Sequence, residues 1–243
     1  MPKKKIHKMR ARNSPEENKM LFYDTLAVDF DSVVNQYDTN KRLRVVFDEL
    51  LSDTELQGLK VLDAGCGTGW FSQVAAQKKA KVTSLDIGEN LLKEVAKKCK
   101  TKCVVGSIME LPFADNTFDV VISSEVIEHV TDPVKGISEC VRVTKPGGLI
   151  IMTTPNRFWH WSLSVAHFFG VRRYDGLENW LSYSDFSIAF TRAGGEIEKQ
   201  QGIHLFPFVV PFLNPILDLT HHFRVPLGPV MVNMAIRARK SVV

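Results

Sequence analysis

One short stretch limits the fold of this chain more than any other: a predicted strand that runs directly into three alternating glycines. Residues 60–64 read as a short buried strand. Gly65, Gly67 and Gly69 follow at once, and a helical pattern begins near residue 70. Glycine permits the positive φ angles of a tight turn and lets the backbone approach a ligand closely. A strand, a glycine loop and a helix in this order are typical of the ligand-binding edge of an open α/β sheet.

The rest of the chain continues this alternation of strands and helices. Strands are predicted at residues 60–64, 81–85, 102–105, 118–123 and 149–153, and late strands near residues 196–204 and 230–237. Helices are predicted at residues 19–36, 40–51, 70–79, 89–98, 133–143 and 184–193. This order indicates an α/β fold with a doubly wound, mainly parallel sheet of seven strands. The two late strands are expected to form an antiparallel pair at its edge.

The length and charge of the chain indicate one domain with a basic tail. Its 243 residues suit a single domain, expected over residues 17–243, with apolar insertions near residues 157–183 and 205–229. Six Lys and Arg side chains precede Glu16, and the remaining 25 face 27 Asp and Glu. A nearly neutral body argues against nucleic acid as a partner. Residues 1–16 are read as a solvated arm, or as a weak contact to anionic lipid or RNA.

Cysteine spacing and hydropathy favour a cytoplasmic protein. The four cysteines form no Cys-x-x-Cys pair, and the first residues contain no apolar signal segment. The longest apolar stretch, residues 205–217, is interrupted by three prolines and is too short to cross a bilayer. We therefore expect free thiols and a cytoplasmic location, with contact at a membrane surface as an open alternative.

Two carboxylates indicate the kind of cofactor that the glycine loop binds. Asp86 ends the predicted strand at residues 81–85, where its carboxylate can accept hydrogen bonds from two ribose hydroxyls. The glycine spacing is GxGxG, whereas loops that bind a pyrophosphate have GxGxxG. Asp63 stands immediately before the loop, where it would repel a pyrophosphate and suit a cationic ammonium or sulfonium. The cofactor is thus expected to be a positively charged nucleoside.

On these residues the chain resembles the class I S-adenosylmethionine-dependent methyltransferases, which have a Rossmann-like fold. The resemblance runs from about residue 21 to residue 195, and it implies a methyltransferase enzyme with S-adenosyl-L-methionine as cofactor. It implies that Asp63, Gly65 and Gly67 surround the methionine end. The other residues expected to bind the cofactor are Cys66, Asp86 at the ribose, Ile87, Ser107 and Ile108 at the adenine, and Ser124.

A second group of polar residues follows the predicted fourth strand. Glu125, Glu128 and His129 would share one face if this segment were helical. Two carboxylates and an imidazole suit Mg²⁺ or a similar cation. The segment resembles the ubiquinone-biosynthesis O-methyltransferases, in which the matching group is associated with a divalent ion. Three interpretations remain open: a metal site formed by the three residues, His129 acting with Glu128 as general base without metal, or a structural role.

The segment after the predicted fifth strand is unusually aromatic. Asn156 and Arg157 are expected to line the acceptor side, although Arg157 suits a surface ion pair equally well. In residues 158–169 apolar side chains cover most of the helical circumference. Such a segment packs in the core, covers an apolar acceptor, or lies on a bilayer surface.

These features together predict methyl transfer to a small acceptor molecule, apolar or lipidic, most readily on oxygen. A methyltransferase acting on carbon, nitrogen or a macromolecule is the alternative. A module that binds S-adenosylmethionine without catalysis remains a third reading.

Overall fold

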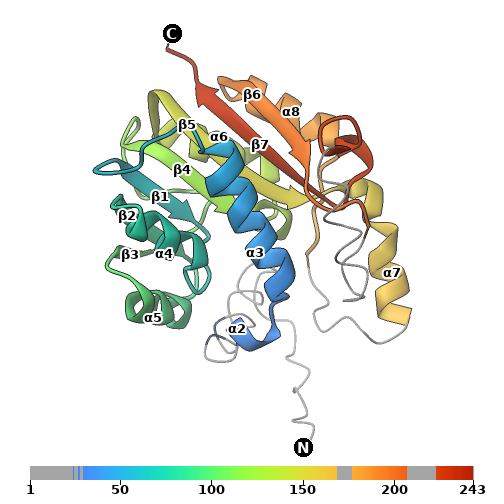
Figure 1. Cartoon of the computed structure of the whole chain (residues 1–243), viewed down its shortest axis with the longest axis horizontal. Helices are drawn as coiled ribbons and strands as arrows, with labels where there is room; N and C mark the ends of the chain where they lie inside the picture. Colours follow the sequence, from blue (N-terminus) through green and yellow to red (C-terminus); the bar gives the residue numbers. More distant parts are fainter. Residues whose placement is uncertain (1–23, 25–26, 28–29, 169–176, 207–222, 243) are drawn as a thin grey trace, which may run out of the picture.

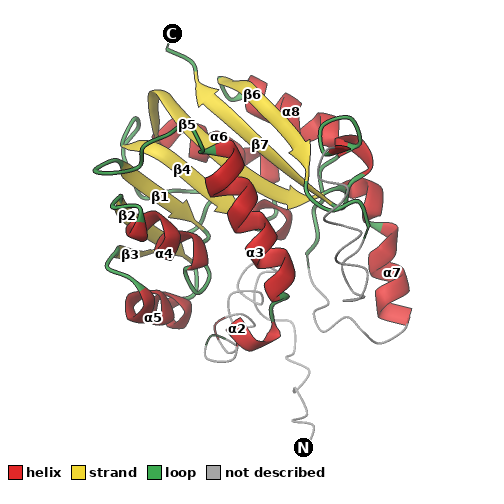
Figure 2. Ribbon diagram, in the orientation of Figure 1, coloured by secondary structure: helices red, strands yellow, loops and turns green. Residues whose placement is uncertain are grey.

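A seven-stranded sheet with helices on both faces forms the centre of the protein (Figures 1 and 2). The computed structural model describes residues 24, 27, 30–168, 177–206 and 223–242. The strands are β1 (Lys60–Ala64), β2 (Lys81–Asp86), β3 (Lys102–Val105), β4 (Phe118–Ser124), β5 (Thr144–Pro155), β6 (Gly195–Gly202) and β7 (Asn233–Lys240). Their order across the sheet is β3-β2-β1-β4-β5-β7-β6.

The helices between these strands follow the predicted alternation. The α-helices are α2 (Phe30–Val33), α3 (Gln36–Arg44), α4 (Trp70–Gln77), α5 (Glu89–Lys98), α6 (Pro133–Val143), α7 (Trp161–Phe168) and α8 (Tyr183–Arg192). Single turns of other helix types are η1 (Val45–Leu50), η2 (Ile127–His129), η3 (Arg157–Trp159) and η6 (Gly228–Val230). No helix among the described residues is long and apolar enough to cross a membrane.

The sheet is parallel from β3 to β5 and antiparallel beyond it. β1 pairs in parallel with β2 and β4, and β4 pairs in parallel with β5. β7 lies between β5 and β6 and is antiparallel to both. The predicted fold class is confirmed, and the late antiparallel pair lies at the edge next to β5.

Neighbouring residues of each central strand pack on opposite faces of the sheet. Leu62 belongs to a core cluster with Phe186 and Phe190 of α8, whereas Val61 belongs to a cluster with Leu50 and Phe71. The same alternation holds along β4 and β5. Both faces are therefore covered, which requires the apolar character of these strands.

Several predicted boundaries were wrong. The fifth strand was expected at residues 149–153 but spans Thr144–Pro155, and the last was expected near residues 230–237 but spans Asn233–Lys240. The second N-terminal helix was expected at residues 40–51, but α3 begins at Gln36 because the Asn35 side chain accepts a hydrogen bond from the Asp38 N–H (3.3 Å). The first predicted helix, residues 19–36, falls largely outside the described residues, and its described part ends at Val33. The late insertions near 157–183 and 205–229 are described only in part, and residues 1–16 are not described.

Candidate active site

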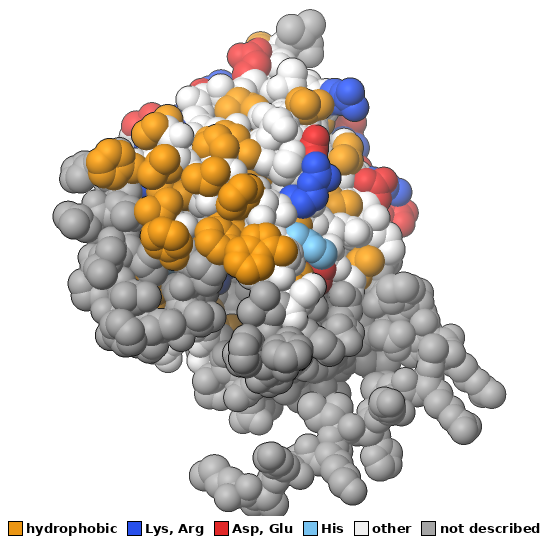
Figure 3. All heavy atoms as spheres, turned by 90° about the vertical axis from the view of Figure 1, so that its right-hand side faces the viewer, with side chains coloured by type: hydrophobic (Ala, Val, Ile, Leu, Met, Phe, Trp, Pro, Cys, Tyr) orange, Lys and Arg blue, Asp and Glu red, His pale blue; other side chains and the backbone are white. Residues whose placement is uncertain are grey.

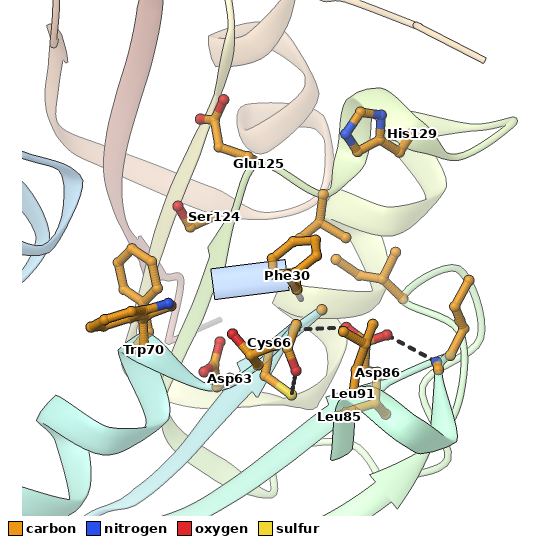
Figure 4. Close-up of a pocket in the computed structure, with 18 of the residues that line it drawn as sticks. Phe30, Asp63, Cys66, Trp70, Leu85, Asp86, Leu91, Ser124, Glu125 and His129 are labelled. Carbon is orange, nitrogen blue, oxygen red and sulfur yellow. Dashed lines mark hydrogen bonds between the residues drawn. The ribbon is translucent and has the colours of Figure 1, made fainter. Parts of the chain in front are cut away.

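A cavity of about 560 Å³ opens at the carboxyl ends of β1, β2 and β4 (Figure 4). Parallel strands bring these ends to one edge of the sheet, where ligands of open α/β folds bind. All nine residues predicted to contact the cofactor line this cavity. They are Asp63, Gly65, Cys66, Gly67, Asp86, Ile87, Ser107, Ile108 and Ser124.

The glycine loop lines the cavity directly after β1 and is anchored on the neighbouring strand. The backbone N–H groups of Gly65 and Cys66 both donate to the carbonyl of Leu85 in β2 (2.7 and 2.9 Å). Gly65 has φ +78°, and a Cβ there would lie 2.5 Å from the methyl groups of Val126. Two features therefore require glycine at this position: the positive φ angle, and the lack of room for a Cβ beside Val126.

Asp86 is held rigidly at the end of β2. Its two carboxylate oxygens accept hydrogen bonds from the N–H groups of Gly67 (2.8 Å) and Gly88 (2.9 Å) (Figure 4). Burial raises the pKa of this carboxyl, and the two N–H donors oppose that effect. The Asp86 carboxylate thus faces the cavity in one fixed orientation, which suits recognition of a ribose diol.

Asp63 lies deeper and is almost fully buried (2% exposed). It accepts a hydrogen bond from the Ser72 hydroxyl (2.6 Å), which continues through Ser84 to Thr101. Burial raises the pKa of Asp63 to about 7. A cation in the cavity would favour the charged form of this carboxyl, so Asp63 is suited to a ligand that carries positive charge.

The N-terminal part of the chain completes the cavity, which no sequence motif indicated. Phe30, Val34 and Arg42 line it together with Trp70. The Asp31 carboxylate connects α2 to the glycine loop, because it accepts hydrogen bonds from the Thr68 hydroxyl and the Trp70 indole N–H. It also forms an ion pair with Lys98. Because α2 and α3 are distant from the glycine loop along the chain, only the folded arrangement reveals these contacts.

Glu125, Glu128 and His129 do not share a helical face. Glu125 has a left-handed backbone (φ +56°), and η2 includes only the residues from Ile127 to His129. The Glu125 carboxylate accepts from Thr153 (3.0 Å) and Asn233 (2.8 Å), away from the other two. Burial raises its pKa to about 7. Figure 4 shows Glu125 and His129 on separate sides of the upper cavity.

The predicted metal site is therefore not supported. Among the residues that the structure describes, no three His, Cys, Asp or Glu side chains form a group that could hold a metal ion. The buried Glu128 carboxylate accepts from Thr154 (3.2 Å), and Glu125 is held by its own two donors. The left-handed turn at Glu125 separates the three side chains that a helix would have brought together. Mg²⁺ has no matching ligand set at Glu125, Glu128 and His129.

His129 occupies the position at the cavity that suits acid–base chemistry. It lines the cavity together with Glu125, whereas Glu128 does not. The His129 Nε2 atom lies 3.7 Å from Glu128, and its Nδ1 atom lies 3.9 Å from Glu178. Two carboxylates beside the ring would stabilise an imidazolium.

Asn156 and Arg157 do not line the cavity, contrary to expectation. The buried Asn156 amide donates to the carbonyls of Pro229 (2.8 Å) and Met231 (3.1 Å). Arg157 forms an exposed ion pair with Asp185 (2.9 Å). Both side chains hold the chain after β5 in place, and the ion-pair reading of Arg157 is the correct one.

The fold and this cavity define a class. A sheet of order β3-β2-β1-β4-β5-β7-β6, a glycine loop after β1 and an acid at the end of β2 are the features of the Rossmann-like S-adenosylmethionine methyltransferase fold. Residues 62–152 match the family of methyltransferase domains. Over residues 62–152 the chain is therefore similar to a methyltransferase domain, and the fold agrees with that similarity.

Individual relatives agree with this assignment. The chain is 35% identical over 132 residues to the malonyl-[acyl-carrier protein] O-methyltransferase of Erwinia billingiae, covering 53% of each chain. It is 38% identical over 107 residues to the ubiquinone biosynthesis O-methyltransferase of Rhizobium leguminosarum bv. trifolii, covering 42% of each. The aligned part thus spans about half the length of these curated relatives.

Solved structures show the same fold. The magnesium protoporphyrin IX methyltransferase of Synechocystis PCC 6803, solved with bound S-adenosylmethionine, matches with a TM-score of 0.67 at 16% identity, over 96% of this chain and 100% of that one. The [4+2]-cyclase SpnF matches with a TM-score of 0.67 at 18% identity, over 94% of this chain and 97% of that one. Because a cyclase shares the fold, the reaction must be argued from the site.

Proposed function

We propose that the protein transfers the methyl group of S-adenosylmethionine to an oxygen of a small apolar or lipidic acceptor. The observation that carries this proposal is one continuous cavity with two chemically different ends. Asp63 and Asp86 stand at the glycine-loop end, and His129 stands at the other.

The residues at the glycine-loop end fit S-adenosylmethionine. In this proposal Asp86 binds the ribose, Ile87, Ser107 and Ile108 surround the adenine, and the loop from Asp63 to Gly67 receives the methionine end. Cys66 and Ser124 complete the contacts. When bound, the cofactor supplies a methyl group on a cationic sulfur.

The opposite end of the cavity suits a neutral, largely apolar acceptor. Phe30, Val34, Val126 and Val130 contribute apolar surface to the cavity wall. His129 would take the proton from the acceptor hydroxyl, and the nearby Glu128 carboxylate would hold the ring and stabilise its charged form. Alignment of two bound reactants contributes about 7–11 kcal/mol in favourable cases, so holding the acceptor beside the methyl group would be the main task of the cavity.

The relatives favour oxygen as the methylated atom. Two of the named relatives are O-methyltransferases, one for a malonyl-carrier protein and one for ubiquinone biosynthesis. The second name fits an acceptor with a phenolic hydroxyl, which is the type of group that a histidine base activates.

Substitution of His129 separates catalysis from binding. We expect His129→Ala to bind S-adenosylmethionine as the parent does, because His129 is at the acceptor end, and to lose about 10²–10⁴-fold in turnover. Binding is measured by calorimetry, and turnover by S-adenosylhomocysteine formation with a panel of phenols, catechols and fatty acids. His160→Ala, outside the cavity, is the matched control.

Three outcomes would contradict the proposal. Unchanged turnover in His129→Ala would remove the assigned base. Tight cofactor binding with no methylation of any oxygen acceptor would favour a binding module. Methylation of carbon or nitrogen acceptors alone would favour the other enzyme class.

A further inference from the structure

A group of aromatic and aliphatic side chains forms an apolar face outside the candidate active site. We define this aromatic face as Phe158, Trp159, Trp161, Phe206, Phe223, Val225 and Val230. Five of these side chains, all but Trp159 and Val230, are between 53% and 58% exposed. Figure 3 shows apolar side chains gathered over this side of the molecule. A monomeric protein seldom exposes so many large apolar side chains together unless the surface binds something.

Contacts between side chains from three separate segments of the chain hold this face together. The Trp159 ring stacks on Trp161 (centroids 5.6 Å apart) and meets Phe206 edge-on (6.5 Å). Its indole N–H donates to the carbonyl of Val230 (2.8 Å), which ties η3 to η6. The indole N–H of Trp159 thus has its hydrogen-bond partner within the protein. The exposed rings beside it are available to contact an apolar partner.

The topology puts this face at the same edge of the sheet as the cavity. β5 and β6 both run antiparallel to β7, so both end at the edge where β7 begins. β1 and β4 are parallel to β5, so their carboxyl ends meet at that edge too. η3 follows β5, Phe206 follows β6, and η6 precedes β7. A partner bound to the aromatic face is therefore at the same edge of the sheet as the cavity.

We propose that the aromatic face docks on the surface of a lipid bilayer. Exposed Trp and Phe side chains are those that partition into the interface between headgroups and acyl chains. Membrane binding does not depend on the proposed reaction. Its use in presenting the cavity to lipidic acceptors does rest on that proposal.

The sequence around the face favours lipid over a protein partner. The chain leaves the face at Phe206 and returns at Phe223, and residues 207–217 between them include only apolar side chains and Asn214. In the sequence, Arg172 and Arg173 follow Phe168, the last residue of α7, by four and five positions. Cations next to an apolar surface complement the anionic headgroups of a bilayer.

Vesicle flotation tests this proposal on the full chain. We expect the protein to float with phosphatidylcholine vesicles, and more strongly when phosphatidylglycerol is included. The double variant Phe158→Ser/Trp161→Ser should lose about a hundredfold in partitioning, since each aromatic contact contributes about tenfold. The matched control Val105→Ser/Val134→Ser removes exposed apolar side chains elsewhere and should float like the parent. Calorimetric uptake of S-adenosylhomocysteine checks that both variants are folded.

Several outcomes would overturn the proposal. Absence of flotation of the parent protein would reject lipid as the partner of the aromatic face. Flotation that survives the aromatic double variant but is lost on deletion of residues 2–12 would assign lipid binding to the basic tail. A dimer in solution that the same double variant dissociates would make the face a contact between two copies. None of these readouts requires methyl transfer, so failure of the membrane proposal is distinguishable from failure of the proposed function.

Discussion

Gly65 illustrates how strongly single residues define the cofactor loop. Its φ of +78° would strain any other side chain, and its Cβ position is already occupied by Val126. Gly58 has nearly the same angle (φ +79°) but nothing within 4 Å of its Cβ position. A comparison of substitutions at the two glycines therefore distinguishes the cost of the backbone angle from the cost of the steric contact.

Alanine substitution at these two glycines should give different losses of stability. We expect Gly58→Ala to lower the free energy of unfolding by about 1 kcal/mol, the cost of the left-handed backbone alone. Gly65→Ala should lower it by about 3 kcal/mol, because Val126 must also move. Urea unfolding measures both values. Equal losses would show that the Val126 contact relaxes without cost.

Asp63 should make the stability of the protein depend on pH. Its pKa is about 7 in the folded protein, against an ordinary value of 3.8. Between these two values the folded protein binds more protons than the unfolded chain, so its free energy of unfolding falls as the pH rises. The slope from one such carboxyl is at most about 1.4 kcal/mol per pH unit.

Replacement of this carboxyl tests the effect. Asp63→Asn should flatten the decline in unfolding free energy between about pH 4 and pH 7, measured by urea unfolding at several pH values. Glu125, whose pKa is also raised to about 7, contributes in the same direction, so part of the slope should remain. An unchanged slope in the variant would show that Asp63 is charged throughout this range.

At the scale of elements, α3 is held against the sheet by a buried polar network. Asp38 accepts from Arg42 (3.0 Å) and lies 2.9 Å from the ring of His204, which follows β6. Arg42 also donates to Ser124 at the end of β4 (2.9 Å). Through these contacts α3 brings Arg42 to the wall of the cavity.

Removal of Asp38 should therefore disturb both stability and the site. We expect Asp38→Ala to lower the free energy of unfolding by about 3–5 kcal/mol, because it leaves the buried Arg42 charge without its closest partner. Asp48→Ala, which removes an exposed acid from the adjoining η1, should change it by less than about 0.5 kcal/mol. Thermal and urea unfolding compare the two. A small loss for Asp38→Ala would mean that Arg42 finds compensation from Glu125.

For the whole molecule, the cavity joins parts of the chain that are far apart in sequence. α2, the loop after β1, the end of β2 and the segment after β4 all contribute walls. A ligand that contacts them together stabilises the folded state only, and at a concentration of 100 times its Kd the gain is about 2.7 kcal/mol. A ligand bound in the cavity should therefore stabilise the whole fold against unfolding, and not only the glycine loop.

Added S-adenosylhomocysteine should raise the melting temperature progressively with its concentration. Scanning calorimetry measures this shift, with adenosine as a weaker comparison ligand that lacks the methionine end. Asp86→Asn should reduce the shift for both ligands, since each carries the ribose. A melting temperature that does not respond to S-adenosylhomocysteine would count against the assigned cofactor site.

Local sequence patterns determined much of this protein. The strand at residues 60–64 and the helices at residues 89–98 and 133–143 were predicted with their observed bounds. The nine predicted cofactor residues all line one cavity. The element bounds follow from the hydrophobic period of each element. The cofactor residues were assigned from the family resemblance of the motifs, and they meet because parallel strands end at a common edge.

Tertiary structure decided the remainder. The left-handed turn at Glu125 separated the predicted metal ligands, and no periodicity reveals a φ angle that is stabilised by contacts to Thr153 and Asn233. Phe30 and Arg42 reached the cavity only through the packing of α2 and α3. Sequence spacing describes neighbours along the chain, whereas these features depend on residues that become neighbours only when the chain folds.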